Sequence, residues 1–175
     1  MPPRVGIGFD AHPWDTGRPL RLGGVEVPHQ AGLRGHSDGD ALLHALTDAL
    51  LGAAGLGSIG DHFPPTDPAW ENADSAFFLS RAAALAIERG LRIGNLDVLM
   101  IAEAPRLAPH VPAIRARIAA ILDVDPRVVS VRGTSSNGLG FAGRGEGIAA
   151  MAVVLLLDDA SGESPKSKTQ NPKSK

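Results

Sequence analysis

Residues 36–68 read HSDGDALLHALTDALLGAAGLGSIGDHFPPTDP and hold the most regular pattern in the chain. Asp40 is a predicted N-cap, because a carboxylate accepts hydrogen bonds from the free N–H groups of a first helical turn. The apolar residues that follow predict a helix through about Leu51. Residues 33–40 are expected to form a loop, and the Gly-, Pro- and Asp-rich residues 52–73 a second one. A loop as long as this second one is uncommon unless it has a function.

Strand-like and helix-like segments alternate on both sides of this stretch. Strands are predicted over Arg4–Phe9, Asn95–Ile101, Val128–Arg132 and Ile148–Leu157, a short hairpin over Leu20–Val27, and helices from Asp74 or Ser75 to about Glu88 and over Pro109–Leu122. The alternation predicts an α/β or α+β fold built on a β-sheet.

The composition predicts one globular domain. The chain has 175 residues, of which 43% are hydrophobic, and a formal net charge of −2, which excludes a wholly disordered or collagen-like chain. We expect a single domain at 1–160. Residues 161–175, SGESPKSKTQNPKSK, are polar and aperiodic and predict a disordered Lys/Ser-rich tail. The absence of cysteine excludes disulfide scaffolds and thiol nucleophiles, so any transition metal needs His and carboxylate ligands.

The charge distribution argues against nucleic acid as a partner. All four lysines lie within the last ten residues, and residues 1–160 carry thirteen arginines against 18 acidic residues, a formal charge of −5. Nucleic-acid-binding proteins need a broad basic surface instead. No apolar run has the length of a signal peptide or of a membrane span, which is about 20 residues. We therefore expect a cytoplasmic protein with no membrane partner.

Three side chains suggest a metal site. Asp10 and His12 are two residues apart on a predicted strand, so both side chains point to the same face. His44 lies on the predicted helix, on the face that also carries Asp40 and Asp48. Two ligands from a strand end and one from a helix would leave one coordination position open, as in catalytic zinc sites. The spacing alone also permits a strand-end carboxylate and a surface histidine.

Three further segments have the composition of anion-binding sites. His36–Asp40 places a His, a Ser and two acidic residues before a predicted helix N-terminus. Gly133–Gly147, GTSSNGLGFAGRGEG, can bring backbone N–H groups close to a phosphate. Arg106 lies in Ala102–Pro109, at the end of a predicted strand, where ligands tend to bind. Each segment also has a simpler interpretation. His36–Asp40 could be a capped, solvent-exposed loop, Gly133–Gly147 a hairpin connection and Ala102–Pro109 a rigid connector.

Taken together, these motifs resemble those of the 2-C-methyl-D-erythritol 2,4-cyclodiphosphate synthase family of the non-mevalonate isoprenoid pathway. The matching segments are GFDAH at 8–12, the stretch quoted above, ADS at 73–75, NLDV at 95–98, IAEAPRLAPHV at 101–111 and LGFAGRGEGIAA at 139–150. The resemblance covers about residues 4–158. It implies a mixed β-sheet with helices packed on one face, in a homotrimer with the sheets inside and the active sites between subunits. We expect the stand-alone enzyme, without a preceding cytidylyltransferase domain.

The resemblance also implies a set of site residues. Asp10, His12 and His44 match the family's zinc ligands, with one Zn²⁺ per subunit, and His36 and Ser135 match its catalytic residues. The implied substrate-binding positions are Asp10, His12, His36, Ser37, Ser58, Ile59, Gly60, Phe63, Pro64, Pro65, Thr66, Asp67, Ala102, Glu103, Ala104, Pro105, Arg106, Leu107, Ala108, Thr134, Ser135, Ser136, Asn137, Phe141 and Arg144.

This sequence departs from the family's pattern at three positions. Asn137 stands where a Glu commonly binds a second divalent cation, Mg²⁺ or Mn²⁺; an amide oxygen can ligate such a cation but brings no charge. Ser58 replaces the usual acid of a G-D-I-G segment, and Ser135 replaces a Thr but keeps its hydroxyl. Phe141 and Arg144 match residues near the threefold axis, where an isoprenoid diphosphate is a candidate ligand.

The implied reaction converts 4-diphosphocytidyl-2-C-methyl-D-erythritol 2-phosphate to 2-C-methyl-D-erythritol 2,4-cyclodiphosphate and CMP. The 2-phosphate attacks the β-phosphorus, and divalent ions lower the repulsion between the two anions. Such an enzyme is a phosphorus–oxygen lyase and needs no redox cofactor. Two other functions stay open. One is a different metal-dependent phosphotransferase or phosphohydrolase, and the other is a non-catalytic trimeric sensor of isoprenoid diphosphates.

Overall fold

The chain folds around one mixed β-sheet. The computed structural model describes residues 2–159, and the predicted tail at 161–175 lies outside them. Within that range the main sheet has five strands in the order β4-β1-β7-β5-β6. These are β1 (Arg4–Asp15), β4 (Gly32–Leu33), β5 (Leu91–Ile101), β6 (Val129–Thr134) and β7 (Gly147–Asp158). β5 and β6 run parallel, while the other neighbours are antiparallel.

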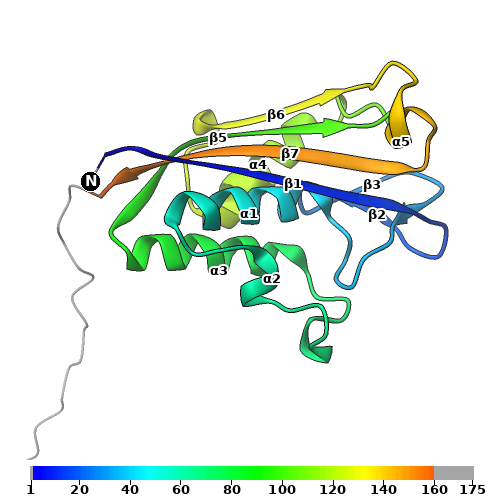
Figure 1. Ribbon diagram of the computed structural model, residues 1–175. Helices are drawn as coiled ribbons and strands as arrows, with labels where there is room; N and C mark the ends of the chain where they lie inside the picture. Colours follow the sequence, from blue (N-terminus) through cyan, green and yellow to red (C-terminus); the bar gives the residue numbers. More distant parts are fainter. Residues whose placement is uncertain (1, 160–175) are drawn as a thin grey trace, which may run out of the picture.

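The three long helices lie on one face of this sheet, as the family resemblance implies (Figure 1). The long ones are α1 (Ala41–Ala54), α3 (Ser75–Glu88) and α4 (Val111–Leu122). The short ones are α2 (Ile59–His62), α5 (Gly140–Gly143) and the 3-10 turns η1 (Pro68–Trp70) and η2 (Pro126–Val128). β2 (Leu20–Leu22) and β3 (Val25–Val27) form the predicted hairpin. Among residues 2–159, no helix combines the length and the apolar content that crossing a bilayer requires.

Several predicted boundaries differ from the observed ones. The first strand continues from Phe9 to Asp15, because its ladder with β7 runs on to the Pro13–Gly147 pair after the apolar alternation has ended. The predicted loop at 52–73 holds the end of α1 together with α2 and η1. α5 was not predicted, since four residues rich in glycine carry no helical period.

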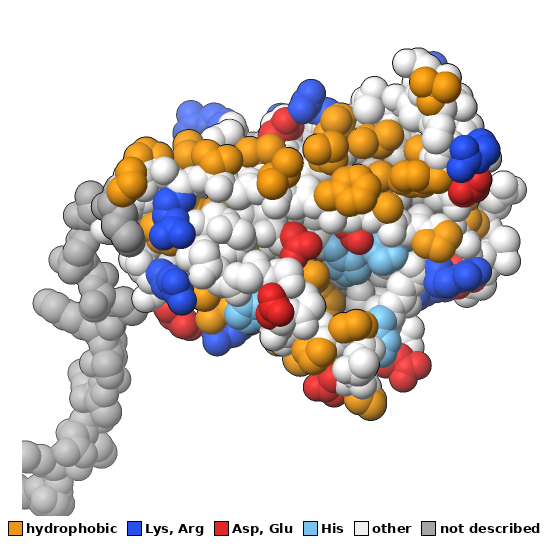
Figure 2. Space-filling model, viewed as in Figure 1, with side chains coloured by type: hydrophobic (Ala, Val, Ile, Leu, Met, Phe, Trp, Pro, Cys, Tyr) orange, Lys and Arg blue, Asp and Glu red, His pale blue; other side chains and the backbone are white. Residues whose placement is uncertain are grey.

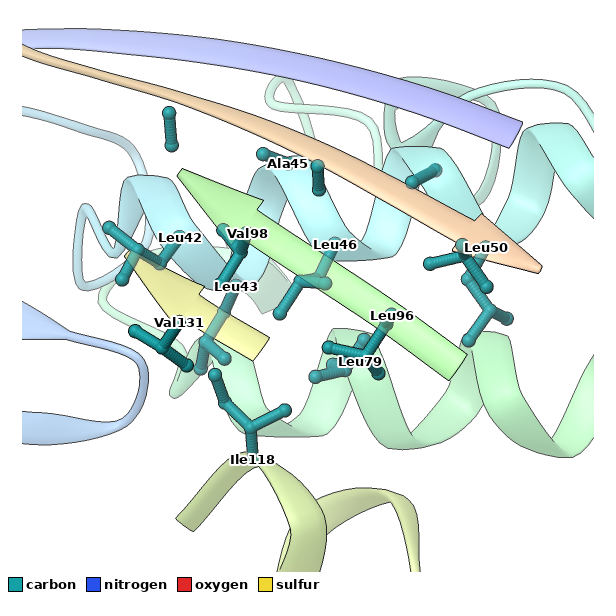
Figure 3. Close-up of a cluster of buried hydrophobic side chains, with 14 of the residues drawn as sticks. Leu42, Leu43, Ala45, Leu46, Leu50, Leu79, Leu96, Val98, Ile118 and Val131 are labelled. Atoms are coloured by element: carbon teal, nitrogen blue, oxygen red, sulfur yellow. The ribbon is translucent and has the colours of Figure 1, made fainter. Parts of the chain in front are cut away.

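Two glycines of β1 allow α1 to lie directly on the sheet. A Cβ atom at Gly6 would lie 1.9 Å from the carbonyl oxygen of Ala49, and one at Gly8 would lie 2.0 Å from that of Ala45. Because the two backbones touch, leucines flanking this contact fill the remaining space beneath the sheet. The core shown in Figure 3 includes Leu42, Leu43, Leu46, Leu50, Leu79, Leu96, Val98, Ile118 and Val131.

The opposite face of the sheet is apolar and exposed along β1 and β7. Ile7 pairs with Val153 and Phe9 with Met151, and these side chains are 66%, 44%, 55% and 37% exposed, respectively. Val5, one more outward-facing position of β1, is 67% exposed. Figure 2 shows the band of hydrophobic side chains that results. We call Val5, Ile7, Phe9, Met151 and Val153 the apolar strip.

Candidate metal centre

The three predicted ligands meet where β1 crosses the start of α1. Asp10 and His12 follow Gly6 and Gly8 on the side of β1 that faces α1, and His44 lies in the first turns of that helix. Asp10 Oδ2 lies 2.6 Å from His12 Nε2 and 2.9 Å from His44 Nδ1. The two ring nitrogens are 3.1 Å apart. The strand alternation and the helix thus bring one carboxylate oxygen and two imidazole nitrogens to one point.

The charges of this cluster favour an ionised carboxylate. Burial raises the pKa of Asp10, but hydrogen bonds to His12 and His44 outweigh it and hold that pKa well below its ordinary value. Burial lowers the pKa of His12, but the Asp10 carboxylate outweighs it, and the net pKa is raised. A cation bound at this point would therefore displace the proton from the His12 imidazole. Its positive charge would then balance the negative charge of the Asp10 carboxylate.

The donor set fits a divalent metal ion. The three ligand atoms all lie within 4.8 Å of one another, and each residue is partly buried. One carboxylate with two imidazoles is a ligand set found in catalytic zinc sites. His12 Nδ1 lies 2.6 Å from the carbonyl oxygen of Arg34, which leaves Nε2 free to face the ion. His44 Nε2 lies 2.8 Å from Ser75 Oγ and 3.0 Å from Ser37 Oγ, away from the ion.

A cavity of about 260 Å³ opens over the three ligands. It brings together predicted site residues from four segments of the chain. Its lining consists of Asp10, His12, His36, Ser37, His44, Asp48, Ile59, Gly60, Phe63, Pro65, Trp70 and Phe78. The site prediction had omitted Asp48, Trp70 and Phe78. Of these three, only Asp48 could have been found from the sequence, because it lies four residues from His44. Burial raises the pKa of Asp48, although the Ile59 N–H donates a hydrogen bond to its carboxylate.

A second cavity of about 450 Å³ lies beside the ends of β5 and β6. Its lining consists of Met100, Ala102, Glu103, Pro105, Arg106, Leu107, Ala108, Val111, Gly133, Thr134 and Ser135. Glu103 accepts hydrogen bonds from the N–H groups of Gly138 and Ser136, and these hold its pKa below the ordinary value. This carboxylate thereby links the two segments that line the cavity. The lining shares no residue with that of the first cavity.

The remaining predicted positions line neither cavity. Ser58 donates to Asp61 and caps α2, and the Asp67 carboxylate caps η1. Phe141 lines a cavity of about 240 Å³ together with His12 and Pro13, near the C-terminal end of β1. Pro64, Thr66, Ala104, Ser136, Asn137 and Arg144 also lie outside the two linings.

The two acids of the predicted anion-binding loop stabilise the fold instead. Asp40 is fully buried and accepts from the N–H groups of Gly23, Gly24 and Leu43, at 2.9, 2.6 and 3.1 Å. Asp38 accepts from the hydroxyl and the N–H of Ser75 at 2.5 and 3.1 Å. Of this loop, His36 and Ser37 are the residues that line the cavity.

Comparisons with known proteins agree with this arrangement. A curated relative from Symbiobacterium thermophilum, 2-C-methyl-D-erythritol 2,4-cyclodiphosphate synthase, is 57% identical over 87% of this chain and 97% of its own. A structure of the same enzyme bound to CDP is 39% identical, with a TM-score of 0.81 over 88% of this chain and all of that one.

A longer protein also contains this fold. The bifunctional IspDF of Campylobacter jejuni is 42% identical with a TM-score of 0.86, and the match covers 90% of this chain and 43% of that structure. The model of the YgbB family matches residues 3–157. Since this match spans nearly all of the described residues and the relative from Symbiobacterium thermophilum is 57% identical, the chain belongs to the YgbB family.

Proposed function

We propose that the chain converts 4-diphosphocytidyl-2-C-methyl-D-erythritol 2-phosphate to 2-C-methyl-D-erythritol 2,4-cyclodiphosphate and CMP. An oxygen of the 2-phosphate forms a bond to the β-phosphorus. The bond from that phosphorus to the oxygen bridging to the α-phosphorus breaks, and CMP leaves with the electron pair. The observation that carries the proposal is the joint placement of Asp10, His12 and His44 with His36 and Ser37 around one cavity.

The residues of this cavity would bind and orient the two phosphates. Zn²⁺ held by Asp10, His12 and His44 would supply a positive charge that lowers the repulsion between attacking and attacked anions. The exposed His36 ring and the Ser37 hydroxyl line the same cavity and would contact phosphate oxygens. Holding both phosphates in one cavity supplies the proximity that an intramolecular attack requires.

The second cavity would bind the cytidine half of the substrate. Its lining includes residues of the predicted cytidine-binding segment, such as Arg106 and Leu107, together with Thr134 and Ser135. In this proposal Ser135 stabilises negative charge on the transferred phosphate, and Asn137 offers an amide oxygen to Mg²⁺ or Mn²⁺. The similar structure of a 2-C-methyl-D-erythritol 2,4-cyclodiphosphate synthase contains bound CDP, which supports a nucleotide site in this fold.

The separation of the two cavities supports an active site between subunits. Their linings share no residue, which is compatible with one substrate that contacts the metal centre of one subunit and the cytidine cavity of another. The apolar strip supports a homotrimer with the sheets inside, since a monomer rarely leaves paired apolar side chains in water. Phe141 and Arg144 would then lie near the threefold axis, where an isoprenoid diphosphate is a candidate ligand. The synthase domain would span residues 1–160.

Turnover of the proposed substrate tests this function. The purified chain is supplied with Zn²⁺ and Mg²⁺ or Mn²⁺, and CMP and the cyclic product are measured by mass spectrometry. We expect both products in equal amounts, no turnover with His44→Ala, and unchanged turnover with His29→Ala, whose ring stacks on Trp14. Release of inorganic phosphate would indicate a phosphohydrolase instead. Zinc binding without turnover would favour the non-catalytic sensor.

A further inference from the structure

Ser75 and Asp38 stand behind the metal centre and have no role in the proposed reaction. Ser75 is the first residue of α3 and is fully buried, with 0% of its surface exposed. Asp38 lies in the loop before α1 and accepts from both the hydroxyl and the N–H of Ser75. Neither residue lines the cavity over the metal ligands. They reach the ligand His44 through the Ser75 hydroxyl, which also lies 3.4 Å from Ser37 Oγ.

The position of the His44 ring decides where its proton must be. Nδ1 faces Asp10 and His12, so binding a cation there requires a lone pair on Nδ1. The ring proton then resides on Nε2, which needs an acceptor because it is partly buried. The two acceptors within reach are Ser75 Oγ at 2.8 Å and Ser37 Oγ at 3.0 Å.

The Asp38 carboxylate makes Ser75 the better acceptor. A carboxylate only accepts hydrogen bonds, so at 2.5 Å the Ser75 hydroxyl proton points to Asp38. The lone pairs of Ser75 Oγ are then free to accept from Nε2. If Nε2 lost its proton and Nδ1 carried it, the nearer hydroxyl, Ser75, could donate to the ring only by abandoning the carboxylate, and the more distant Ser37 would have to donate instead. Asp38 therefore disfavours the tautomer that cannot bind a cation.

We propose that Ser75 and Asp38 are positioning residues that hold His44 in its metal-binding tautomer. A partly buried chain of hydrogen bonds runs from the His44 N–H to Ser75 and from the Ser75 O–H to Asp38. Ser37, unlike Ser75, lines the cavity, and its Oγ lies 3.0 Å from His44 Nε2 and 3.4 Å from Ser75 Oγ. The inference rests on the metal-binding part of the proposed function and does not depend on cyclisation. Partners of this kind typically contribute about 10–100-fold in metal affinity.

Zinc affinity, measured by competition with a chromophoric chelator, tests the assignment. We expect Ser75→Ala to weaken zinc binding about 10–100-fold and Ser37→Ala to weaken it less. Asp38→Asn keeps an oxygen that accepts from Ser75 but removes the charge, and its affinity should fall between those of the wild type and Ser75→Ala. The matched control is Ser80→Ala on the exposed side of the same helix, where the hydroxyl donates to the Phe77 carbonyl oxygen. Thermal melts of the metal-free variants identify any that fail to fold.

The wild-type protein provides a second test that needs no substitution. Long-range ¹H–¹⁵N spectra of the zinc-loaded chain should show the His44 proton on Nε2, slow to exchange, and Ser75→Ala should speed that exchange. A proton on Nδ1, or Ser75→Ala affinity equal to that of Ser80→Ala, overturns the inference. Absence of zinc binding by the wild-type chain would instead overturn the metal centre itself, and turnover measurements are not involved in either outcome.

Discussion

Gly8 of β1 and Ala45 of α1 are in backbone contact, and this contact fixes how far His44 stands from Asp10. A Cβ atom at Gly8 would lie 2.0 Å from the Ala45 carbonyl oxygen, well inside van der Waals contact. His44 is the residue before Ala45, and Asp10 is the next inward-facing residue after Gly8. The geometry of the candidate metal centre therefore depends on a glycine that contributes no ligand.

Gly8→Ala should separate α1 from β1. We expect the free energy of unfolding to fall by about 2–3 kcal/mol, because the added methyl group overpacks a backbone contact that cannot relax. Zinc affinity should fall as well, since His44 moves away from Asp10. Urea unfolding and chelator competition measure the two effects. Gly52→Ala is the control: nothing lies within 4 Å of its added Cβ, so it should stabilise α1 by about 0.5–1 kcal/mol. Equal effects of the two substitutions would refute the explanation.

Asp40→Ala should destabilise the fold more than removal of an ordinary helix cap. Its buried carboxylate accepts from Gly23 and Gly24 as well as from Leu43 of α1, so its loss leaves N–H groups of two segments without acceptors. We expect a loss of about 3 kcal/mol in urea unfolding. Asp74→Ala removes an exposed cap that accepts only from Ala76 and should cost about 1 kcal/mol. A loss at Asp40 no larger than at Asp74 would contradict this account.

Zinc affinity should fall as the pH is lowered. The pKa of His12 is raised above its ordinary 6.5, so below that raised pKa a proton competes with the metal for the ring. Asp10, whose pKa is lowered, stays ionised and adds no dependence in this range. We expect the binding constant to fall about tenfold per pH unit below the His12 pKa and to level off above it. Calorimetry in buffers of different ionisation enthalpy should detect the released proton. A binding constant that stays constant from pH 6 to pH 8 would exclude this competition.

Ile7→Asp should dissociate the proposed trimer. The substitution places a charge in the centre of the apolar strip, opposite Val153, where burial without a partner is costly. Sedimentation equilibrium should show a mass near three chains for the wild type and near one chain for the variant. Ile87→Asp is the matched control, because Ile87 is 62% exposed on α3, on the helical side of the sheet. A wild-type chain that sediments as a monomer would overturn the proposed assembly.

Asn137→Glu should strengthen binding of the second divalent cation. Asn137 has a φ of 53°, a left-handed conformation that asparagine adopts more readily than glutamate. The added carboxylate should therefore lower the Mg²⁺ or Mn²⁺ concentration for half-maximal turnover while costing about 1 kcal/mol of stability. Asn137→Gly relieves the backbone but offers no ligand, so it should raise both the stability and the metal requirement. A metal requirement that stays the same in both variants would remove Asn137 from the proposed cation site.

The sequence alone determined the local features of this protein. Alternation placed Asp10 and His12 on one face of a strand, and the Asp40 cap with its apolar run predicted α1 to within a few residues. These patterns succeed because backbone geometry and capping act within a few residues of each other. Helical spacing placed His44 on the face of α1 that also carries Asp40 and Asp48. The resemblance to a known family added the assignment of these three residues, Asp10, His12 and His44, to zinc, and the function.

Tertiary packing decided what surrounds those residues. The buried roles of Asp38 and Asp40 arise from contacts with Ser75 and with Gly23 and Gly24, which lie 37 and 16–17 residues away in the chain. The continuation of β1 past Phe9 depends on β7, more than 130 residues later. The cavity over the candidate metal ligands and the cavity beside Arg106 each combine segments that are distant in the sequence. Periodicity predicts the direction of a side chain but not its distant partner. Only the fold could reveal that Asp38, in an apparent anion-binding loop, accepts from Ser75, whose hydroxyl contacts the candidate metal ligand His44.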